Sequence, residues 1–192
     1  GSPITHGHAL GFPGADSITV WLRGDATRLY GLQLAYDEAG TGATTVAYNY
    51  AMLEQDFTVR FDVDGLRPNT TYYYRITVDD VPQGSFRPVR TAPEADDTVR
   101  LAFGSCSRTG TSDDRREQQK SFENLIARNL DAFLLVGDSH YGNAQTLSQH
   151  RDFIRDTLRI RSRNELFTRV PLAATWDDHD YGPNDSDRSY VL

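Results

Sequence analysis

Residues 173–185, AATWDDHDYGPND, place four aspartates around one histidine. The histidine is His179, and the aspartates are Asp177, Asp178, Asp180 and Asp185. Carboxylates crowded in this way repel one another unless a cation lies among them or water solvates them all. The segment is therefore interpreted either as a solvated acidic loop or as part of a metal site.

Two other segments end in residue types that bind metals. LAFGSCS carries Cys106 after an apolar run, and LLVGDSHY carries Asp138 and Tyr141 after another. Each has a structural alternative, since free cysteines are usually buried, aspartates often cap turns or helices, and tyrosines are often half-buried. Because three consecutive apolar runs end in such residues, we favour a shared metal site over three separate structural roles.

The donor types indicate which metals would bind. Thiolate and phenolate are strong anionic donors that suit a trivalent transition ion, whereas carboxylates suit hard cations from calcium and magnesium to manganese. The mixture predicts more than one ion and more than one kind of metal. Such clusters are typical of sites where two metals activate a water and neutralise a phosphoryl group.

The elements that would position these residues alternate along the second half of the chain. Buried strands are predicted at VRLAFGSC and DAFLLVGD, and a third strand at VPLAATWDD. Helices are predicted at QQKSFENLIARN and at about 147–168, where Phe153, Ile154 and Leu158 form an apolar stripe. This order predicts a parallel sheet with right-handed crossovers, and ligands bind beyond the carboxyl ends of the strands in such sheets.

The first half shows the period-two alternation of short antiparallel strands. Runs of this kind begin at Ile18, Tyr30, Phe57 and Tyr72, and the turn segments DEAGTG and DGLRPNT separate them. We expect a β-sandwich, followed by a polar linker at residues 90–98, RTAPEADDT.

One segment within this half, GLRPNTTYYYRI, resembles the tyrosine corner of fibronectin type III domains. Its Leu66, Pro68, Thr70 and Tyr72 follow the pattern Leu-x-Pro-x-Thr-x-Tyr, in which the tyrosine hydroxyl bonds to nearby backbone. We therefore expect a structural role for these residues and no chemistry.

The composition excludes some classes of protein. A hydrophobic content of 38% is typical of a globular protein, and a net charge of −7 argues against nucleic-acid binding through general electrostatics. No apolar run reaches the roughly 20 residues of a membrane span. The single cysteine excludes a disulfide within the chain.

The chain resembles the PhoD-type alkaline phosphatases in four segments, found in the family's order. These are ITHGHALGFPGADSITVWLR, LAFGSCS, LLVGDSHY and ATWDDHDYGPND, of which the WDDHDYG string is the most specific. The resemblance implies a fibronectin III-like β-sandwich over residues 1–95. It also implies that residues 96–192 form the N-terminal half of a calcineurin-like metallophosphoesterase domain, with α/β/β/α architecture.

The resemblance also implies an activity and a metal set. It points to a metal-dependent phosphatase that cleaves phosphomonoesters, phosphodiesters or both, in small molecules or in a phosphodiester polymer, by attack of a metal-bound hydroxide on phosphorus. Cys106 and Tyr141 would bind Fe3+, Asp138 would bridge metals, and Asp178 would bind a second metal, expected to be Ca2+. Mn2+, Mg2+ and Zn2+ are alternatives.

Further roles follow from the same resemblance. His179 would face the substrate and stabilise the transition state or protonate the leaving oxygen, while Asn184 would contact phosphate. Arg108 is a candidate on other grounds, because arginine is favoured for bidentate contact with phosphate and Arg108 closely follows the cysteine loop. Asp177 and Asp180 would support the ligands or bind calcium. His140 departs from the family pattern, and is interpreted as an extra ligand, a substrate contact or a surface histidine.

The chain is shorter than members of this family. They continue for another couple of hundred residues that carry further ligands, so a C-terminal half is expected as a separate or missing segment, and residues 99–192 are not expected to be stable alone. Gly1-Ser2 resembles the remnant of a cleaved tag, and we expect a removed export signal and a periplasmic or extracellular protein. The alternatives are a non-catalytic fibronectin-like binding or adhesion module with a degenerate fragment, or a metal-dependent hydrolase of another ester.

Overall fold

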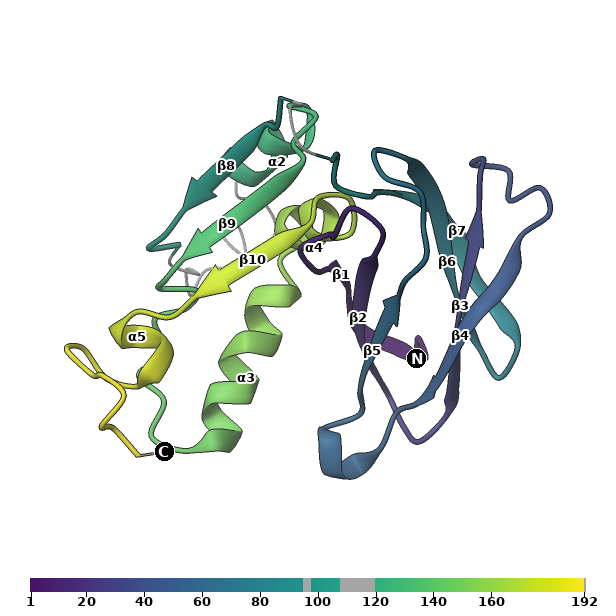
Figure 1. The fold of residues 1–192 in the computed structure, drawn as a ribbon. Helices are drawn as coiled ribbons and strands as arrows, with labels where there is room; N and C mark the ends of the chain where they lie inside the picture. Colours follow the sequence, from purple (N-terminus) through teal and green to yellow (C-terminus); the bar gives the residue numbers. More distant parts are fainter. Residues whose placement is uncertain (95–97, 108–119, 192) are drawn as a thin grey trace. The chain divides into compact units, whose positions relative to one another are not determined.

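The computed structural model describes residues 1–94, 98–107 and 120–191 of the 192-residue chain (Figure 1). The chain forms two compact units: Gly1–Val99 with Phe167–Pro171, and Arg100–Leu166 with Leu172–Leu192. The boundary expected between residues 95 and 96 lies outside the described residues. Within the described part of the chain, no helix is long and apolar enough to cross a membrane.

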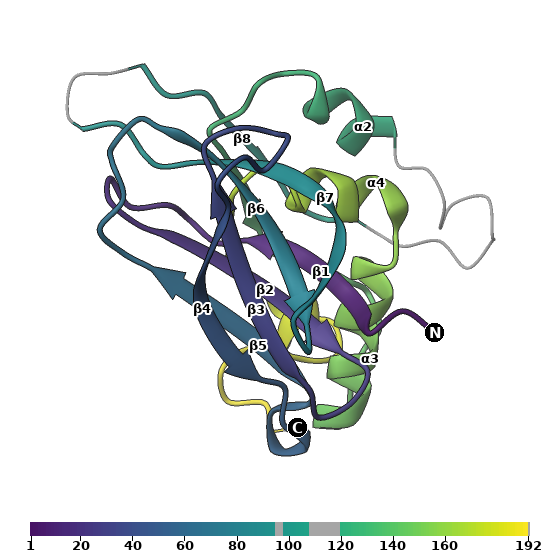
Figure 2. The same ribbon diagram turned by 90° about the vertical axis from the view of Figure 1, so that its right-hand side faces the viewer.

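The first unit contains two antiparallel sheets, which can be followed in Figure 2. One sheet has the order β1-β2-β5, and the other has the order β4-β3-β6-β7. The strands are β1 (Ile4–Leu10), β2 (Ile18–Gly24), β3 (Leu29–Ala35), β4 (Thr44–Tyr50), β5 (Thr58–Val63), β6 (Thr71–Val78) and β7 (Val81–Arg90), with a 3-10 helix η1 (Leu53–Gln55) between β4 and β5.

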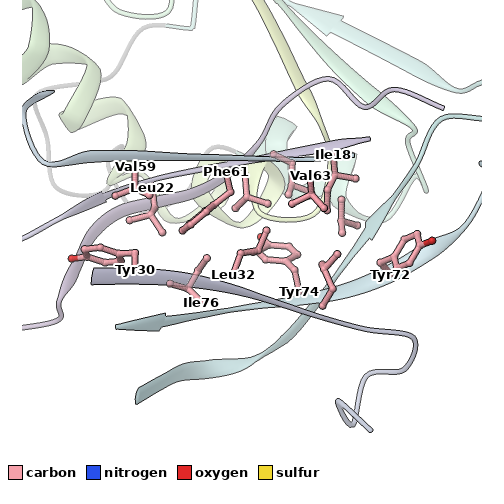
Figure 3. Close-up of a cluster of buried hydrophobic side chains, with 14 of the residues drawn as sticks. Ile18, Leu22, Tyr30, Leu32, Val59, Phe61, Val63, Tyr72, Tyr74 and Ile76 are labelled. Carbon is pink, nitrogen blue, oxygen red and sulfur yellow. The ribbon is translucent and has the colours of Figure 1, made fainter. Parts of the chain in front are cut away.

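The core of the sandwich lies between these sheets (Figure 3). Side chains alternate along each central strand, as in β2, where Ile18, Val20 and Leu22 are buried and their neighbours are partly exposed. Tyr74 and Ile76 of β6 are fully buried in the same core. The period-two alternation therefore predicted the sandwich correctly, because one face of each sheet must leave water.

The tyrosine corner is also present. Tyr72 is buried, and its Oη accepts a hydrogen bond from the backbone N–H of Arg67 at 2.9 Å. Leu66 packs against the core beside it. This bond fixes the turn that leads into β6, which confirms the structural role expected for GLRPNTTYYYRI.

Three strands of the sandwich have no clear signal in the sequence. β1, β4 and β7 all lie at sheet edges. β1 contains two irregularities of register, and β7 contains Pro82 and Pro88, which edge strands tolerate because their outer N–H groups need no partner in the sheet.

The second unit contains a three-stranded sheet of order β10-β9-β8, and both strand pairs are parallel. The parallel pairing is as predicted, while the assignment to half of a metallophosphoesterase domain stays a prediction. The elements are β8 (Leu101–Gly104), α2 (Lys120–Ile126), β9 (Ala132–Val136), α3 (Leu147–Leu158), α4 (Arg161–Phe167), β10 (Leu172–Thr175) and α5 (Asp178–Tyr181).

The helical region expected at about 147–168 is confirmed in position, but it differs from the prediction in two respects. It consists of two helices, since α3 ends at Leu158 and α4 begins at Arg161. The expected apolar stripe is also only partly buried: Ile154 is 37% exposed, whereas the buried side chains of α3 are those of His150 and Thr157. The interruption between the helices lets the chain bury Ile160, which is 1% exposed.

The first predicted strand is not buried on both faces. Leu101 and Phe103 of β8 are 50% and 77% exposed, and they share one face because side chains alternate along a strand. On the opposite face of the sheet Phe133 is buried, with its ring 5.8 Å from that of Phe122 in α2. The apolar sequence of β8 therefore does not mean that both faces of this strand are covered within the chain.

The tyrosine corner gives a stability prediction. Tyr72→Phe should lower the free energy of unfolding of the sandwich by about 1–3 kcal/mol, because the Arg67 N–H loses its acceptor in a partly buried position. Urea denaturation followed by Trp21 fluorescence, in a Trp176→Phe background, measures this. Tyr73→Phe is the matched control and should stay within about 0.5 kcal/mol; equal effects of the two changes would contradict the role of the corner.

Candidate metal centre

The candidate residues occupy equivalent positions after the three parallel strands. β8 ends at Gly104, β9 at Val136 and β10 at Thr175, so Cys106, Asp138 and Asp177 are each the second residue beyond a strand end. Because Gly104 pairs with Leu135 and Thr175 with Val136, the three ends lie side by side at one edge of the sheet. The parallel register thus brings together residues far apart in the sequence.

Cys106, Asp138 and Tyr141 are in direct contact. The Sγ of Cys106 lies 3.5 Å from Oδ2 of Asp138, and the Oη of Tyr141 donates a hydrogen bond of 2.7 Å to the same oxygen. The hydrogen bonds with Cys106 and then with Asp138 raise the pKa of the Tyr141 phenol above its ordinary value. Cys106 is exposed, so the alternative of a buried structural thiol is wrong.

Three carboxylates form an acidic cluster at the same edge. One ligand atom from each of Asp138, Asp177 and Asp178 lies within 4.8 Å of the others. Backbone N–H groups of Asp185 and His179 donate to Asp178 at 2.6 and 3.0 Å, and its pKa is lowered chiefly by the bond from Asp185. The cluster therefore gathers negative charge that a cation would offset.

The donor set fits a metal. Asp138 is 6% exposed, and its Oδ1 is buried without a hydrogen-bond partner. Such an orphaned acceptor is costly unless an ion or a water satisfies it. With a thiol and a phenol on the other carboxylate oxygen, the surroundings of Asp138 combine soft and hard donors, as expected for a mixed metal site.

The backbone at the strand ends is held in uncommon conformations. Cys106 and Asp138 have φ of 54° and 52°, in the left-handed region. Gly137 has φ of 90°, and a Cβ at this position would lie 2.5 Å from Cβ of Asp177. Left-handed conformations of residues other than glycine cost energy, and they also occur at turns of the sandwich such as Asp79 and Asp80, so they do not by themselves mark a functional site.

His179 lies beside the cluster, on α5. Its ring centroid is 4.3 Å from that of Tyr141, and its Nδ1 is buried without a hydrogen-bond partner. Asn184 is exposed in the turn after α5, next to Asp185. Arg108 lies outside the described residues.

His140 is neither an exposed residue nor part of the acidic cluster. It is 2% exposed, and its ring lies 5.1 Å from that of His150 and 5.5 Å from that of Phe153. Its Nδ1 accepts a hydrogen bond from the N–H of Gly142. Burial lowers its pKa to about 4, so it is neutral at pH 7. The interpretation as a surface histidine is wrong, whereas a role as an extra ligand or a substrate contact stays a prediction.

Asp177 and Asp180 have different roles in the structure, and the sequence alone did not distinguish these roles. Asp177 belongs to the acidic cluster and is the N-cap of α5, where its carboxylate accepts from the N–H of Asp178. Asp180 is 3% exposed and completes the capping box. The spacing Asp-x-x-Asp at the start of a short helix was the available signal, because a carboxylate at the N-cap and another three residues later form such a box.

The comparisons with known proteins bear on the family and the fold. The model of the PhoD-like phosphatase N-terminal domain matches residues 1–100. Alkaline phosphatase D of Bacillus subtilis (strain 168) is 25% identical over 215 residues, which cover 95% of this chain and 36% of that protein. This chain therefore spans little more than a third of the curated relative.

A solved structure described as the structure of PhoD is similar in fold. Its TM-score is 0.83 at 21% identity, and the match covers 98% of this chain and 41% of that one. Since the family model spans more than half of the sequence, the chain belongs to the PhoD-like phosphatases.

Proposed function

We propose that this chain is the N-terminal portion of a metal-dependent phosphatase acting on phosphomonoesters, phosphodiesters or both. The observation that carries the proposal is the contact of Cys106 and Tyr141 with one carboxylate oxygen of Asp138, beside the clustered Asp177 and Asp178. A purely structural loop has no need for this set of donors. When bound, the metals would supply the charge that activates water and offsets charge on the phosphoryl oxygens.

The four proposed ligands have distinct parts. Cys106 and Tyr141 would hold Fe3+, Asp138 would bridge, and Asp178 would hold the second ion, Ca2+ or another divalent metal such as Mn2+, Mg2+ or Zn2+. The 2.7 Å contact between Oη of Tyr141 and Oδ2 of Asp138 supports this, because a cation held by both oxygens would take the place of the shared proton. Binding at this residue would therefore release a proton.

His179 is proposed to act on the substrate. It lies on α5 directly after Asp178, and its ring packs on Tyr141. From there an imidazole could donate to a phosphoryl oxygen or to the leaving oxygen. Asn184 and Arg108 are proposed to contact the phosphate, and we place the protein in the periplasm or outside the cell.

A C-terminal portion is proposed to complete the second unit. Leu101, Phe103 and Val136 are 50%, 77% and 41% exposed on neighbouring strands, and apolar faces of this kind are usually covered. The curated relative is much longer than this chain, since the match covers only 36% of it. Such a portion would cover this face and add further ligands.

The metal assignment is tested by Cys106→Ala in the full-length protein. The variant should lose its iron and most of its hydrolysis of nitrophenyl phosphate and bis-nitrophenyl phosphate, by more than the roughly 10–100-fold typical of residues that support a ligand. Elemental analysis and initial rates measure both. Asp64→Asn, at an exposed turn of the sandwich, is the control and should change neither. Unchanged metal content in Cys106→Ala, or no metal in the unaltered protein, would contradict the proposal.

The proposed cover gives a second prediction. In the longer protein Phe103→Ser, at a side chain that is 77% exposed in residues 1–192, should lower the free energy of unfolding by about 3–5 kcal/mol, as for a truncated buried aromatic. Phe12→Ser, at a side chain that is 54% exposed in the first unit, is the control and should stay within about 1 kcal/mol. Calorimetry on both variants measures the difference. An effect of Phe103→Ser as small as that of the control would rule out a cover over this residue.

A further inference from the structure

Two buried side chains of opposite charge lie next to the candidate centre and hold its loops. Arg163 of α4 is 2% exposed and Asp180 of α5 is 3% exposed. Both bond to the backbone of Ser139, the residue that follows Asp138. Charged groups are seldom buried so fully unless they are well paired, so their contacts indicate what they do.

Arg163 joins the first two strand-end loops. Its Nη1 donates to the carbonyl of Ser139 at 3.1 Å, and its Nη2 donates to the carbonyl of Ser107 at 2.5 Å. These carbonyls belong to the residues directly after Asp138 and Cys106. Burial lowers the pKa of Arg163 to about 10, so the guanidinium remains charged at pH 7 and its hydrogen bonds are charge-assisted.

Asp180 joins the second and third loops. Its Oδ1 accepts from the N–H of Ser139 at 2.9 Å, and its Oδ2 accepts from the N–H of Asp177 at 3.0 Å. The two oxygens of one carboxylate therefore fix the distance between the loop of Asp138 and the loop of Asp177 and Asp178. Ser139 connects the two charged side chains, since its N–H donates to Asp180 and its carbonyl accepts from Arg163.

We infer that Arg163 and Asp180 are positioning residues, which set the spacing of Cys106, Asp138 and Asp178 through the backbone of Ser107, Ser139 and Asp177. The inference rests on the proposed metal-dependent function. The need for such a device is physical, because three carboxylates within 4.8 Å repel one another and two of the loops adopt left-handed backbone conformations. Sites of this precision depend on supporting contacts around the ligands.

Neither residue touches the substrate in this proposal, and each acts through the backbone. A guanidinium can bond two carbonyls at once because its donors are fixed in a plane, whereas a lysine ammonium is a point charge on a flexible stem. An asparagine at 180 would retain one acceptor but present an NH2 group to a backbone N–H. Arg163→Lys and Asp180→Asn therefore keep size or charge while removing one of the two connections.

The test measures metal affinity in the full-length protein, stripped with EDTA and titrated with Mn2+ by calorimetry. Arg163→Lys and Asp180→Asn should each raise the Kd for Mn2+ by roughly 10–100-fold. The controls are Arg159→Lys and Asp156→Asn, which change the same residue types in an exposed ion pair at the end of α3 and should leave the Kd within about 3-fold. Near-UV circular dichroism is recorded for every variant, so that only folded protein is compared.

The outcomes separate this inference from the proposed function. A Kd within about 3-fold of the unaltered protein in folded Asp180→Asn and Arg163→Lys would overturn the positioning role and leave the metal site standing. No binding of Mn2+, Ca2+ or Fe3+ by the unaltered protein would overturn both. Hydrogen exchange in the metal-free state adds an independent readout: the amide of Ser139 should exchange faster in Asp180→Asn than in Asp156→Asn, and equal rates would count against the bond.

Discussion

The parallel pairing of β8, β9 and β10 is the constraint on which the candidate centre depends. The carboxyl ends of parallel strands lie at the same edge of a sheet. Residues two positions after each strand therefore lie close together, whatever the structure of the segments that connect the strands. Cys106, Asp138 and Asp177 use this property. The long helical connections that parallel pairing requires also supply Arg163, whose helix α4 lies between β9 and β10 in the sequence.

Electrostatics sets the second condition. Bringing Asp138, Asp177 and Asp178 together is unfavourable, and the chain offsets part of this with backbone N–H groups directed at Asp178 and with a buried guanidinium beside Ser139. These contacts leave Oδ1 of Asp138 without a partner. The repulsion among the carboxylates is therefore only partly offset, and Oδ1 of Asp138 is the atom at which a cation could offset the rest. This favours a metal site over a solvated acidic loop.

The sequence predicts best those elements whose buried and exposed positions are clearly separated. Central strands such as β2 and β6 alternate clearly because one face is in the core, and apolar runs locate β8, β9 and β10. The sequence does not predict the edge strands β1, β4 and β7, because bulges, prolines and exposed faces weaken the alternation of apolar and polar side chains. Ligand types at strand ends indicate Cys106, Asp138 and Asp178, but Arg163 is hidden in an arginine-rich segment, since nothing local distinguishes a buried arginine from a solvated one.

The two units differ in how far their own residues close their cores. In the sandwich, two sheets cover each other, and large side chains such as Tyr30, Phe61 and Tyr74 are 2% exposed or less. In the second unit the sheet buries Phe133 on one face and leaves Phe103 exposed on the other. The free energy that would hold the strand ends in place is thus only partly supplied by packing within this unit. In that situation the proposed hydrogen bonds from Arg163 and Asp180 to the loop backbones matter most. Packing on one face of the sheet leaves the spacing of these loops less constrained, and the hydrogen bonds would supply the missing constraint.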